Sequence, residues 1–281
     1  MKKQLFLLLS FLITVASAQN PDDKKYLLTT NINTFELSTV SFLDPYLSPI
    51  IYSGIGMQYN HQIRSFLKPE QTNISVQSKL NLDISVSLNP QSTSMMMFMG
   101  ANYSWGMHYH FRVQNGFQLL AGALWDVDFG FKEMPRNVNN PVNLDMATNL
   151  NLSGIAMYNF PLFTKTLRLQ LTAQTPLLGY MFVPMGGASY YEMFELGNMS
   201  NTFHLSSPIN KRGLNSSLTV AVPFNKSVWN FGFKYFTLKY TANDMVFDKN
   251  ELSLVIGTTF DAANFSGRKN KAPKNFLSTN E

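Results

Sequence analysis

The chain has 281 residues, of which 45% are hydrophobic, 14% aromatic and only 14% charged, and it contains no cysteine. This composition excludes an intrinsically disordered chain, a disulfide scaffold and a thiolate metal site. The formal charge of +5 arises from Lys2, Lys3 and a basic C-terminal tail, which leaves residues 19–261 neutral overall. Nucleic-acid binding needs basic residues clustered on a folded face, so no nucleic-acid partner is expected.

The N-terminus has the pattern of an export signal. Two lysines precede an apolar run over residues 5–15, and residues 16–18 form the small-residue cleavage site Ala-Ser-Ala. The apolar run is shorter than the roughly 20 residues that a membrane-spanning helix needs. We therefore expect a signal peptide over residues 1–18 that is cleaved after Ala18, which gives a mature chain beginning at Gln19.

Alternating polarity with a period of two dominates the rest of the sequence. Between Asn73 and Leu88 every odd position is polar, and every even position except Ser78 is apolar. Segments 53–64, 95–111 and 116–131 alternate in the same way. Successive side chains of a β-strand point to opposite faces, so each segment forms a strand with one apolar and one polar face. These strands are much longer than the five or six residues that are usual in globular proteins.

Two all-β architectures can use such strands. A soluble sandwich buries its apolar face, but its strands are shorter and its wet face is usually rich in lysine and glutamate. A transmembrane barrel turns its apolar face to lipid and its polar face to the lumen, and its sheet must close because lipid cannot satisfy open edges. The long strands, the export signal and the scarcity of charge favour the barrel.

The strand count supports the same choice, because bacterial barrels have an even number of strands, short periplasmic turns and longer outer loops. The expected strands are 30–42, 53–66, 72–88, 95–111, 116–131, 147–160, 166–176, 214–223, 228–241 and 251–261. We therefore predict an antiparallel up-and-down barrel of about ten strands over residues 19–261, followed by a basic tail over 262–281. An additional hairpin arm at Thr202–Ser207 would raise the count to twelve.

Three loop segments carry a family resemblance. The matching residues are Leu47-Ser48-Pro49 with Tyr52 and Gly54, Asn139-Asn140-Pro141, and Gly187-Ala188-Ser189-Tyr190-Tyr191-Glu192-Met193-Phe194 with Gly197-Asn198. They resemble the family catalogued as domain of unknown function 3316, over roughly residues 43–260. The resemblance implies an exported protein of Gram-negative bacteria that folds as a barrel in the outer membrane. It implies no activity, because the family has none assigned.

The predicted outer loop 177–213 is the first candidate functional segment. Its length exceeds the 12–15 residues at which a structureless connection becomes unusual. Its aromatic residues Tyr190, Tyr191 and Phe194 could present a surface to a ligand, or they could form a structural lid on the barrel mouth. We expect the three rings to pack against the mouth or upper lumen, and Glu192 to pair with a basic lumen residue.

Charged residues on the predicted polar faces form the second candidate. They are Arg64, Lys79, Asp83, Arg112, Asp126, Asp128, Arg168 and Lys234. A ten-strand barrel is only slightly wider than an eight-strand barrel, whose interior is filled by side chains. Unpaired buried charges are costly, so these groups should pair, either as a salt-bridged plug or around a narrow polar channel.

An outer-membrane hydrolase is the remaining alternative, because His108, His110, Asp126 and Asp128 lie on neighbouring strands. A turn over 112–115 would place the imidazoles and the carboxylates seven residues apart, on the order of 20 Å at the usual strand rise. A general base must lie within hydrogen-bond reach of its partner, so this pairing fails. We expect no enzymatic activity, and no catalytic, cofactor-binding or metal site.

The sequence therefore predicts an outer-membrane barrel that allows limited passage of small solutes or binds a ligand at its surface. A purely structural barrel, or one that assembles with another envelope protein, is the alternative. The expected partners are outer-membrane lipid and either a small-molecule ligand or an envelope protein.

Overall fold

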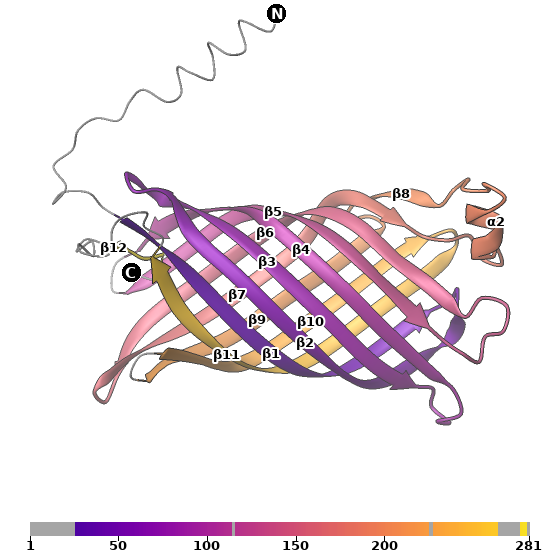
Figure 1. Cartoon of the computed structure of the whole chain (residues 1–281), viewed down its shortest axis with the longest axis horizontal. Coiled ribbons are helices and arrows are strands. Elements are labelled where there is room, and N and C mark those ends of the chain that lie inside the picture. The colour runs from indigo at the N-terminus through magenta and orange to yellow at the C-terminus, as the bar shows by residue number, and fades with distance from the viewer. Residues whose placement is uncertain (1–25, 114–115, 225–226, 264–275, 280–281) are drawn as a thin grey trace, which may run out of the picture.

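The computed structural model describes residues 26–113, 116–224, 227–263 and 276–279. These residues are almost entirely β-structure (Figure 1). No helix among them combines the length and the apolarity needed to cross a membrane.

Ten long strands form the wall of the barrel, and three short elements lie at its ends (Figure 1). The wall strands are β1 (Tyr26–Asp44), β2 (Ser48–Lys68), β3 (Gln71–Leu88), β4 (Met95–Arg112), β5 (Phe117–Glu133), β6 (Val142–Leu162), β7 (Lys165–Phe182), β9 (Lys211–Phe224), β10 (Ser227–Ala242) and β11 (Met245–Ala263). The short elements are α2 (Tyr190–Phe194), β8 (Phe203–Ser206) and β12 (Phe276–Leu277).

Neighbouring wall strands are antiparallel, and the sheet closes on itself. The strands follow one another in chain order around the wall, with β9 beside β7. β11 pairs with β1 along a ladder that runs from Leu28 opposite Ala263 to Leu43 opposite Asp248. This closure confirms the predicted antiparallel barrel, because a sandwich would leave its two sheets unjoined.

Side-chain alternation explains why these segments form a barrel wall. On β3, Leu82 and Ile84 are exposed on the outside, whereas Asp83 and Ser85 are buried toward the interior. The other wall strands expose leucine, isoleucine, methionine and aromatic side chains in the same way. An apolar exterior around a polar interior is the arrangement that a lipid bilayer requires of a barrel.

Each of the ten predicted ranges overlaps one wall strand, but eight of the observed strands extend further at the outer end. β11 begins at Met245 rather than at residue 251, because its pairing with β10 continues up to the turn. That turn consists of Asn243 and Asp244, whose φ angles are 51° and 59°. Positive φ at both central residues is what a two-residue hairpin turn demands, and asparagine and aspartate tolerate it.

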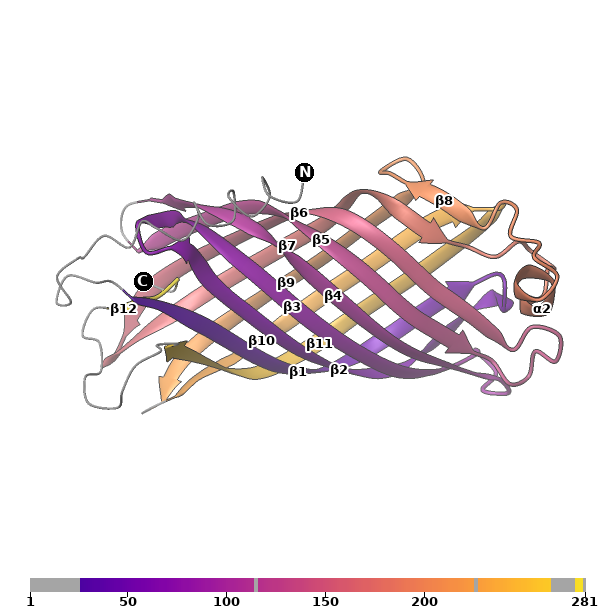
Figure 2. The same cartoon turned by 45° about the horizontal axis from the view of Figure 1, so that its top comes forward.

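The additional hairpin considered at Thr202–Ser207 does not enlarge the barrel. β8 pairs with the outer end of β7, from Gly179 to Phe182, and then the chain turns into β9. β8 therefore lies above β9 on the same side of β7, at the rim of the barrel (Figure 2). The wall has ten strands rather than twelve, as β9 takes the place beside β7 lower down.

The opposite end of the barrel carries a short C-terminal element. β12 pairs in parallel with the start of β1, and Thr279 and Ser278 are buried beside it. The hydroxyl of Thr279 lies 3.2 Å from that of Thr30, and Ser278 donates to Asp261 at 3.0 Å. The predicted signal peptide, and residues 264–275 and 280–281 of the predicted tail, lie outside the described residues.

Candidate functional site: the lumen and its outer lid

The lumen contains two cavities that meet near the middle of the barrel. The outer cavity has a volume of about 200 Å³ and the inner cavity about 410 Å³. Four side chains line both cavities: Lys79 on β3, Gln174 on β7, Asn215 on β9 and Lys234 on β10. We call these four residues the neck. Three of them are long and polar, so the neck can exchange hydrogen bonds with a solute that moves between the cavities.

Ion pairs hold the wall around the neck. Lys234 lies 2.7 Å from Glu36, and both side chains are buried. Lys249 lies 2.6 Å from Asp83 and 2.8 Å from Glu251. These pairs join strands on both sides of the β1–β11 seam, so the interior is cross-linked where the barrel closes. The five charges of these pairs are tolerated because each has a partner of opposite sign.

Asp126 and Asp128 are bound by amide groups rather than by cations. Asn149 and Asn151 donate to Asp126 at 2.9 Å and 2.6 Å, and Asn102 donates to Asp128 at 2.6 Å. The prediction that such lumen charges form direct salt bridges does not hold for these two carboxylates. Neutral amides on the neighbouring strands occupy the positions opposite them, so the carboxylates are stabilised by hydrogen bonds.

Arg64 is the most deeply enclosed of the predicted lumen charges. Its side chain is 1% exposed, and its Nη2 donates to Gln77 at 3.4 Å. Among the described residues, its Nε and Nη1 atoms have no hydrogen-bond partner. Arg64 also lacks the predicted ion pair within the described chain, because an amide and not a carboxylate lies beside it on β3.

The remaining predicted charges occupy different levels of the lumen. Lys79 is part of the neck, and no hydrogen bond or ion pair joins it to another described residue. Arg168 lines the inner cavity, and its Nε donates to Asn159 at 2.8 Å. The side chain of Arg112 lies outside the described part of the structure.

The observed ion pairs use residues that the sequence analysis missed. Glu36 lies on the even-numbered, polar face of the strand predicted at 30–42. The alternation of side chains along the strand could therefore have revealed that it faces the lumen. Lys249 lies in the predicted outer loop, which extends to residue 250, whereas Glu251 is the first residue of the strand predicted at 251–261. Lys132 also lies just beyond the strand predicted at 116–131, whereas in the structure it lies within β5.

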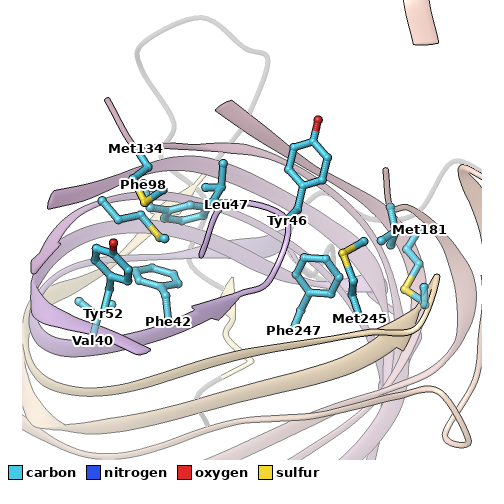
Figure 3. Close-up of a cluster of buried hydrophobic side chains, with 13 residues drawn as sticks. Val40, Phe42, Tyr46, Leu47, Tyr52, Phe98, Met134, Met181, Met245 and Phe247 are labelled. Carbon is cyan, nitrogen blue, oxygen red and sulfur yellow. The ribbon is translucent and has the colours of Figure 1, made fainter. Parts of the chain in front are cut away.

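A cluster of apolar side chains narrows the outer part of the lumen and contributes to the wall of the outer cavity. Phe42 on β1, Phe98 on β4 and Phe247 on β11 project into the interior, together with Met181 on β7 (Figure 3). The inward faces are therefore polar in the middle and apolar at the outer end. A cluster of this kind excludes water by close packing.

A charged network lies at the rim beside this cluster. Lys132 contacts Asp44 at 3.0 Å and Asp145 at 2.6 Å, and both Lys132 and Asp44 are buried. Asp44 also accepts hydrogen bonds from the backbone N–H groups of Tyr46 and Leu47, and so it holds the turn between β1 and β2. One lysine of β5 therefore joins the outer end of β1 to β6.

The loop between β7 and β8 contains the helical turn α2. The hydroxyl of Ser189 accepts from the N–H of Glu192, and the Glu192 carboxylate accepts from the N–H of Ser189 at 2.7 Å. This reciprocal pair is a capping box, which satisfies two backbone donors at the start of a helix. The prediction that Glu192 pairs with a basic lumen residue is wrong, because its carboxylate is used locally.

Tyr190 fastens this loop to the rim. Its hydroxyl donates to Asn143 at 2.9 Å and accepts from the N–H of Leu144 at 2.7 Å. Its ring packs edge-on against Tyr46, whose hydroxyl donates to the carbonyl of Ala188 at 2.8 Å. These contacts agree with a loop that is anchored over the mouth, and we call residues 184–201 the lid.

The other two predicted aromatic residues of the lid are largely exposed. Tyr191 is 65% exposed, and Phe194 is 52% exposed although it stacks on Tyr190 and Phe182. Met193, which is 1% exposed, takes the buried position instead. In a single helical turn, residues three apart share a face, so Tyr190 and Met193 can both point inward while Tyr191 points away.

Burial changes the titration of two phenols at the mouth, Tyr46 in the turn between β1 and β2 and Tyr190 in the lid. Burial, with the nearby carboxylates of Asp44 and Glu192, raises the pKa of Tyr46 from 10.0 to about 12. Burial also raises the pKa of Tyr190 above its usual value. A phenol with a raised folded-state pKa stabilises the fold fully below its unfolded pKa of about 10, and this contribution is lost as the pH rises toward its folded pKa.

We therefore expect alkaline pH to loosen the lid. Between about pH 10 and pH 12 the thermal unfolding temperature should fall, and the fall should be smaller for Tyr190→Phe, which has no phenolic proton to lose there. Far-ultraviolet circular dichroism across this range measures the effect. Tyr191→Phe is the matched control, because the Tyr191 ring is exposed, and it should follow the unmodified protein. An identical fall for all three proteins would contradict the role assigned to Tyr190.

The geometry also corrects the expected alignment of the histidine and aspartate residues. Trp105 lies opposite Trp125, so Asp126 faces Ser104 and His108 faces Gly122. The predicted register was displaced because Gly116, whose φ is 76°, belongs to the turn rather than to β5. Asp126 and His108 are then separated by four residues along the strand, roughly 13 Å.

The imidazoles and carboxylates have separate partners. His108 Nε2 lies 2.9 Å from the Ser153 hydroxyl, and His110 Nε2 lies 2.7 Å from the Ser75 hydroxyl. The described residues contain no group of three or more histidine, cysteine or acidic side chains that could hold a metal ion.

Comparison with protein families gives a match over nearly the whole chain. A family model described as protein of unknown function (DUF3316) matches residues 5–269. The chain belongs to the DUF3316 family. This confirms the family resemblance, and the matched range includes the three loop segments on which it was based. No curated protein matches this DUF3316 member.

Solved structures that resemble this DUF3316 protein are outer-membrane barrels. The translocator domain of the autotransporter NalP from Neisseria meningitidis matches with a TM-score of 0.44 and 9% identity, over 92% of this chain and 94% of that chain. The transport unit of the autotransporter AIDA-I from Escherichia coli gives 0.45 and 10%, over 90% and 96%. The outer membrane protease OmpT from Escherichia coli gives 0.48 and 6%, over 86% and 100%.

Proposed function

We propose that this DUF3316 protein allows the limited passage of small solutes across the outer membrane. The observation that supports this function is the pair of cavities that meet at the neck, with polar side chains along both. A purely structural barrel would gain from filling this space, because cavities cost packing energy. The apolar cluster and the lid narrow the outer end, so passage is expected to be slow or intermittent.

The charges around the inner cavity favour anions. Its lining includes the cations Lys79, Arg168 and Lys234 and the anions Glu36 and Asp261. Lys234 is neutralised by Glu36, whereas Lys79 has no ion pair with any described residue. The inner cavity therefore has an excess of one positive charge. A narrow space lined with low-dielectric walls focuses such a charge on a passing ion.

Replacing Lys79 with methionine should lower the preference for anions. Methionine keeps most of the length of the side chain and removes the charge, so the ratio of chloride to potassium permeability should fall several-fold. Reversal potentials in planar bilayers under a salt gradient measure this ratio. The matched control is Lys239→Met, because Lys239 is exposed outside the lumen on β10. An equal ratio in the two variants would contradict anion selection at the neck.

The lid provides a second test of passage. Deleting residues 186–196 removes the contacts of Tyr190 and Met193 at the mouth, so single-channel conductance should increase. Tyr191→Ala leaves the inward-facing contacts in place and should not change it. Equal conductance with and without the loop would mean that the lid does not control access to the lumen.

Surface ligand binding is the second candidate function, and exposed lid side chains favour it. Tyr191, Phe194 and Leu196 are each more than half exposed on the lid. Exposed aromatic groups on a fixed loop are suited to hold a ligand or an envelope protein. If neither the neck nor the lid variants alter conductance, replacing these three side chains tests whether the protein binds at its surface or is purely structural.

Export precedes either function. We infer from the N-terminal pattern that a signal peptide over residues 1–18 directs the chain to the outer membrane of a Gram-negative bacterium. Mass spectrometry of protein from the envelope fraction should find Gln19 at the N-terminus, and intact Met1 would contradict cleavage after Ala18.

A further inference from the structure

The hydrogen-bonded wall is interrupted between β7 and β9. Their ladder runs from Arg168 opposite Ala221 to Gln174 opposite Asn215 and ends there. β7 pairs again on this side only at Gly179, with β8. In the structure as described, no backbone pairing joins residues 175–178 to β8 or β9. By contrast, the ladder between β5 and β6 continues without a break over the whole of β5.

Local sequence explains the interruption. Pro176 has no backbone N–H, so it cannot donate to a neighbouring strand. On the other side, residues 207–210 form a turn that satisfies its own groups, since the N–H of Lys211 donates to the carbonyl of Ser207 at 2.8 Å. Asn210 donates its side-chain N–H to Leu205 at 2.8 Å. Neither strand edge therefore needs backbone hydrogen bonds from the other.

Side-chain packing alone closes the interrupted part of the wall. A Cβ atom placed on Gly213 of β9 would lie 3.4 Å from the Cδ of Pro176. The two residues therefore face one another across the break without a hydrogen bond. Separating them requires only the loss of a few apolar contacts, each worth about 0.1–0.2 kcal/mol per atom pair, rather than the loss of backbone hydrogen bonds.

The break opens onto the outer cavity at the level of lipid. Pro176, Gly213 and Leu214 line that cavity, and Leu214 is also exposed on the outside of the barrel. Leu177 and Leu178 are exposed beside the break, as a lipid-facing wall requires.

The outer cavity itself suits a molecule with an apolar body. Phe98, Phe236, Phe247 and Leu238 contribute apolar walls. The lining also contains six carboxylates and five lysines, and four of these lysines are held by ion pairs or hydrogen bonds within the described chain. The fifth, Lys79, leaves an ammonium at the neck without such a partner. An apolar compound gains by moving from water into such a cavity, and an acidic end group gains from the ammonium.

We propose that the break between β7 and β9 is a lateral portal, through which a small amphipathic acid moves between the outer cavity and the outer leaflet of the membrane. This inference rests on the proposed passage function, since the route along the lumen and the route through the wall meet in the outer cavity. The inference adds the second route and names the chemical class of the solute. We call residues 175–178 and 211–214 the portal.

The absence of native cysteine permits a direct test with single-cysteine variants in lipid vesicles. Ala147→Cys places a thiol in the outer cavity, which Ala147 lines. Ser85→Cys is the matched control, because Ser85 faces the interior and is buried but does not line either cavity. N-hexadecylmaleimide, which stays in the bilayer, and a sulfonated maleimide, which stays in water, are applied separately. Mass spectrometry follows the rate of modification.

The bilayer reagent should modify Ala147→Cys at least about tenfold faster than Ser85→Cys, a ratio that corresponds to a barrier difference of about 1.4 kcal/mol. Adding Gly213→Val, which fills the portal, should remove most of that advantage. Ala221→Val adds similar bulk to β9 within the regular ladder and should not remove it. Heat-modifiable migration on gels verifies that each variant is folded.

Two results would overturn the portal. One is equal modification of both cysteines by the bilayer reagent, and the other is a fast reaction of Ala147→Cys that Gly213→Val does not slow. The aqueous reagent distinguishes failure of the portal proposal from failure of the proposed passage function. If it reaches Ala147→Cys while the bilayer reagent does not, only the portal fails. If neither reagent reaches it, the outer cavity is closed and both proposals fail.

Discussion

Replacing Lys132 with methionine is expected to destabilise the barrel by about 3–5 kcal/mol, the usual cost of removing one partner from a buried charge network. Lys132 is the cation for both Asp44 and Asp145 at the rim. Methionine preserves the volume of the side chain, but it leaves two carboxylates close together without their countercharge. The turn that Asp44 holds, and the lid that packs on that turn through Tyr46, should loosen with it.

Urea unfolding in lipid vesicles measures this loss. Lys68→Met is the matched control, because Lys68 is an exposed lysine at the other end of the barrel. A second variant, in which Lys132→Met is combined with Asp145→Asn, removes one of the unpaired charges and should recover part of the stability. If Lys132→Met is as stable as Lys68→Met, the network at the rim does not hold the outer end together.

Replacing Leu82 with arginine should cost about 2–4 kcal/mol, because it places a cation on the lipid-facing side near the middle of the membrane. Leu82 is exposed on the outside of β3, halfway along the strand. Asn81→Arg is the matched control on the next residue, whose side chain lines the outer cavity.

Asn81→Arg should cost less, about 1 kcal/mol for the hydrogen bonds of the amide. The difference between the two variants tests the orientation of the whole wall, since a shift of one residue exchanges the two faces of a strand. A consistently greater cost for Asn81→Arg, and for equivalent lumen positions on other strands, would mean that the faces had been assigned in the wrong sense.

The wall could be predicted from the sequence because lipid imposes a strict rule on every strand. The alternation of Leu82 and Asp83 is visible in the sequence, and it determines the face of each residue without reference to any other strand. The ends of the strands are less predictable, because they depend on pairing with a neighbouring strand rather than on local polarity. For example, pairing with β10 extends β11 as far as Met245.

The candidate site could be predicted only in part, for a related reason. Parity places Asp83 inside the barrel, but its partner Lys249 lies 166 residues away in sequence and was assigned to a loop. A one-residue error at a turn also changes which side chains are opposite, as Gly116 shows. The capping box of Ser189 and Glu192 has the local signature of a helix start, so it could have been found. The cavities depend on the packing of all ten strands, so they could not be predicted from the sequence.

The joining of β1 to β11 has a consequence for how the protein folds. Residues paired along this seam are separated by nearly the full length of the wall, as Leu28 and Ala263 show. Contacts of such high sequence separation pay a large loop-closure entropy and usually form late. Until β11 arrives, β1 and β10 each present an open row of unsatisfied backbone groups, which cannot persist in hydrocarbon. Insertion should therefore be cooperative, and a chain that ends before Met245 should fail to enter the bilayer rather than insert as a smaller barrel.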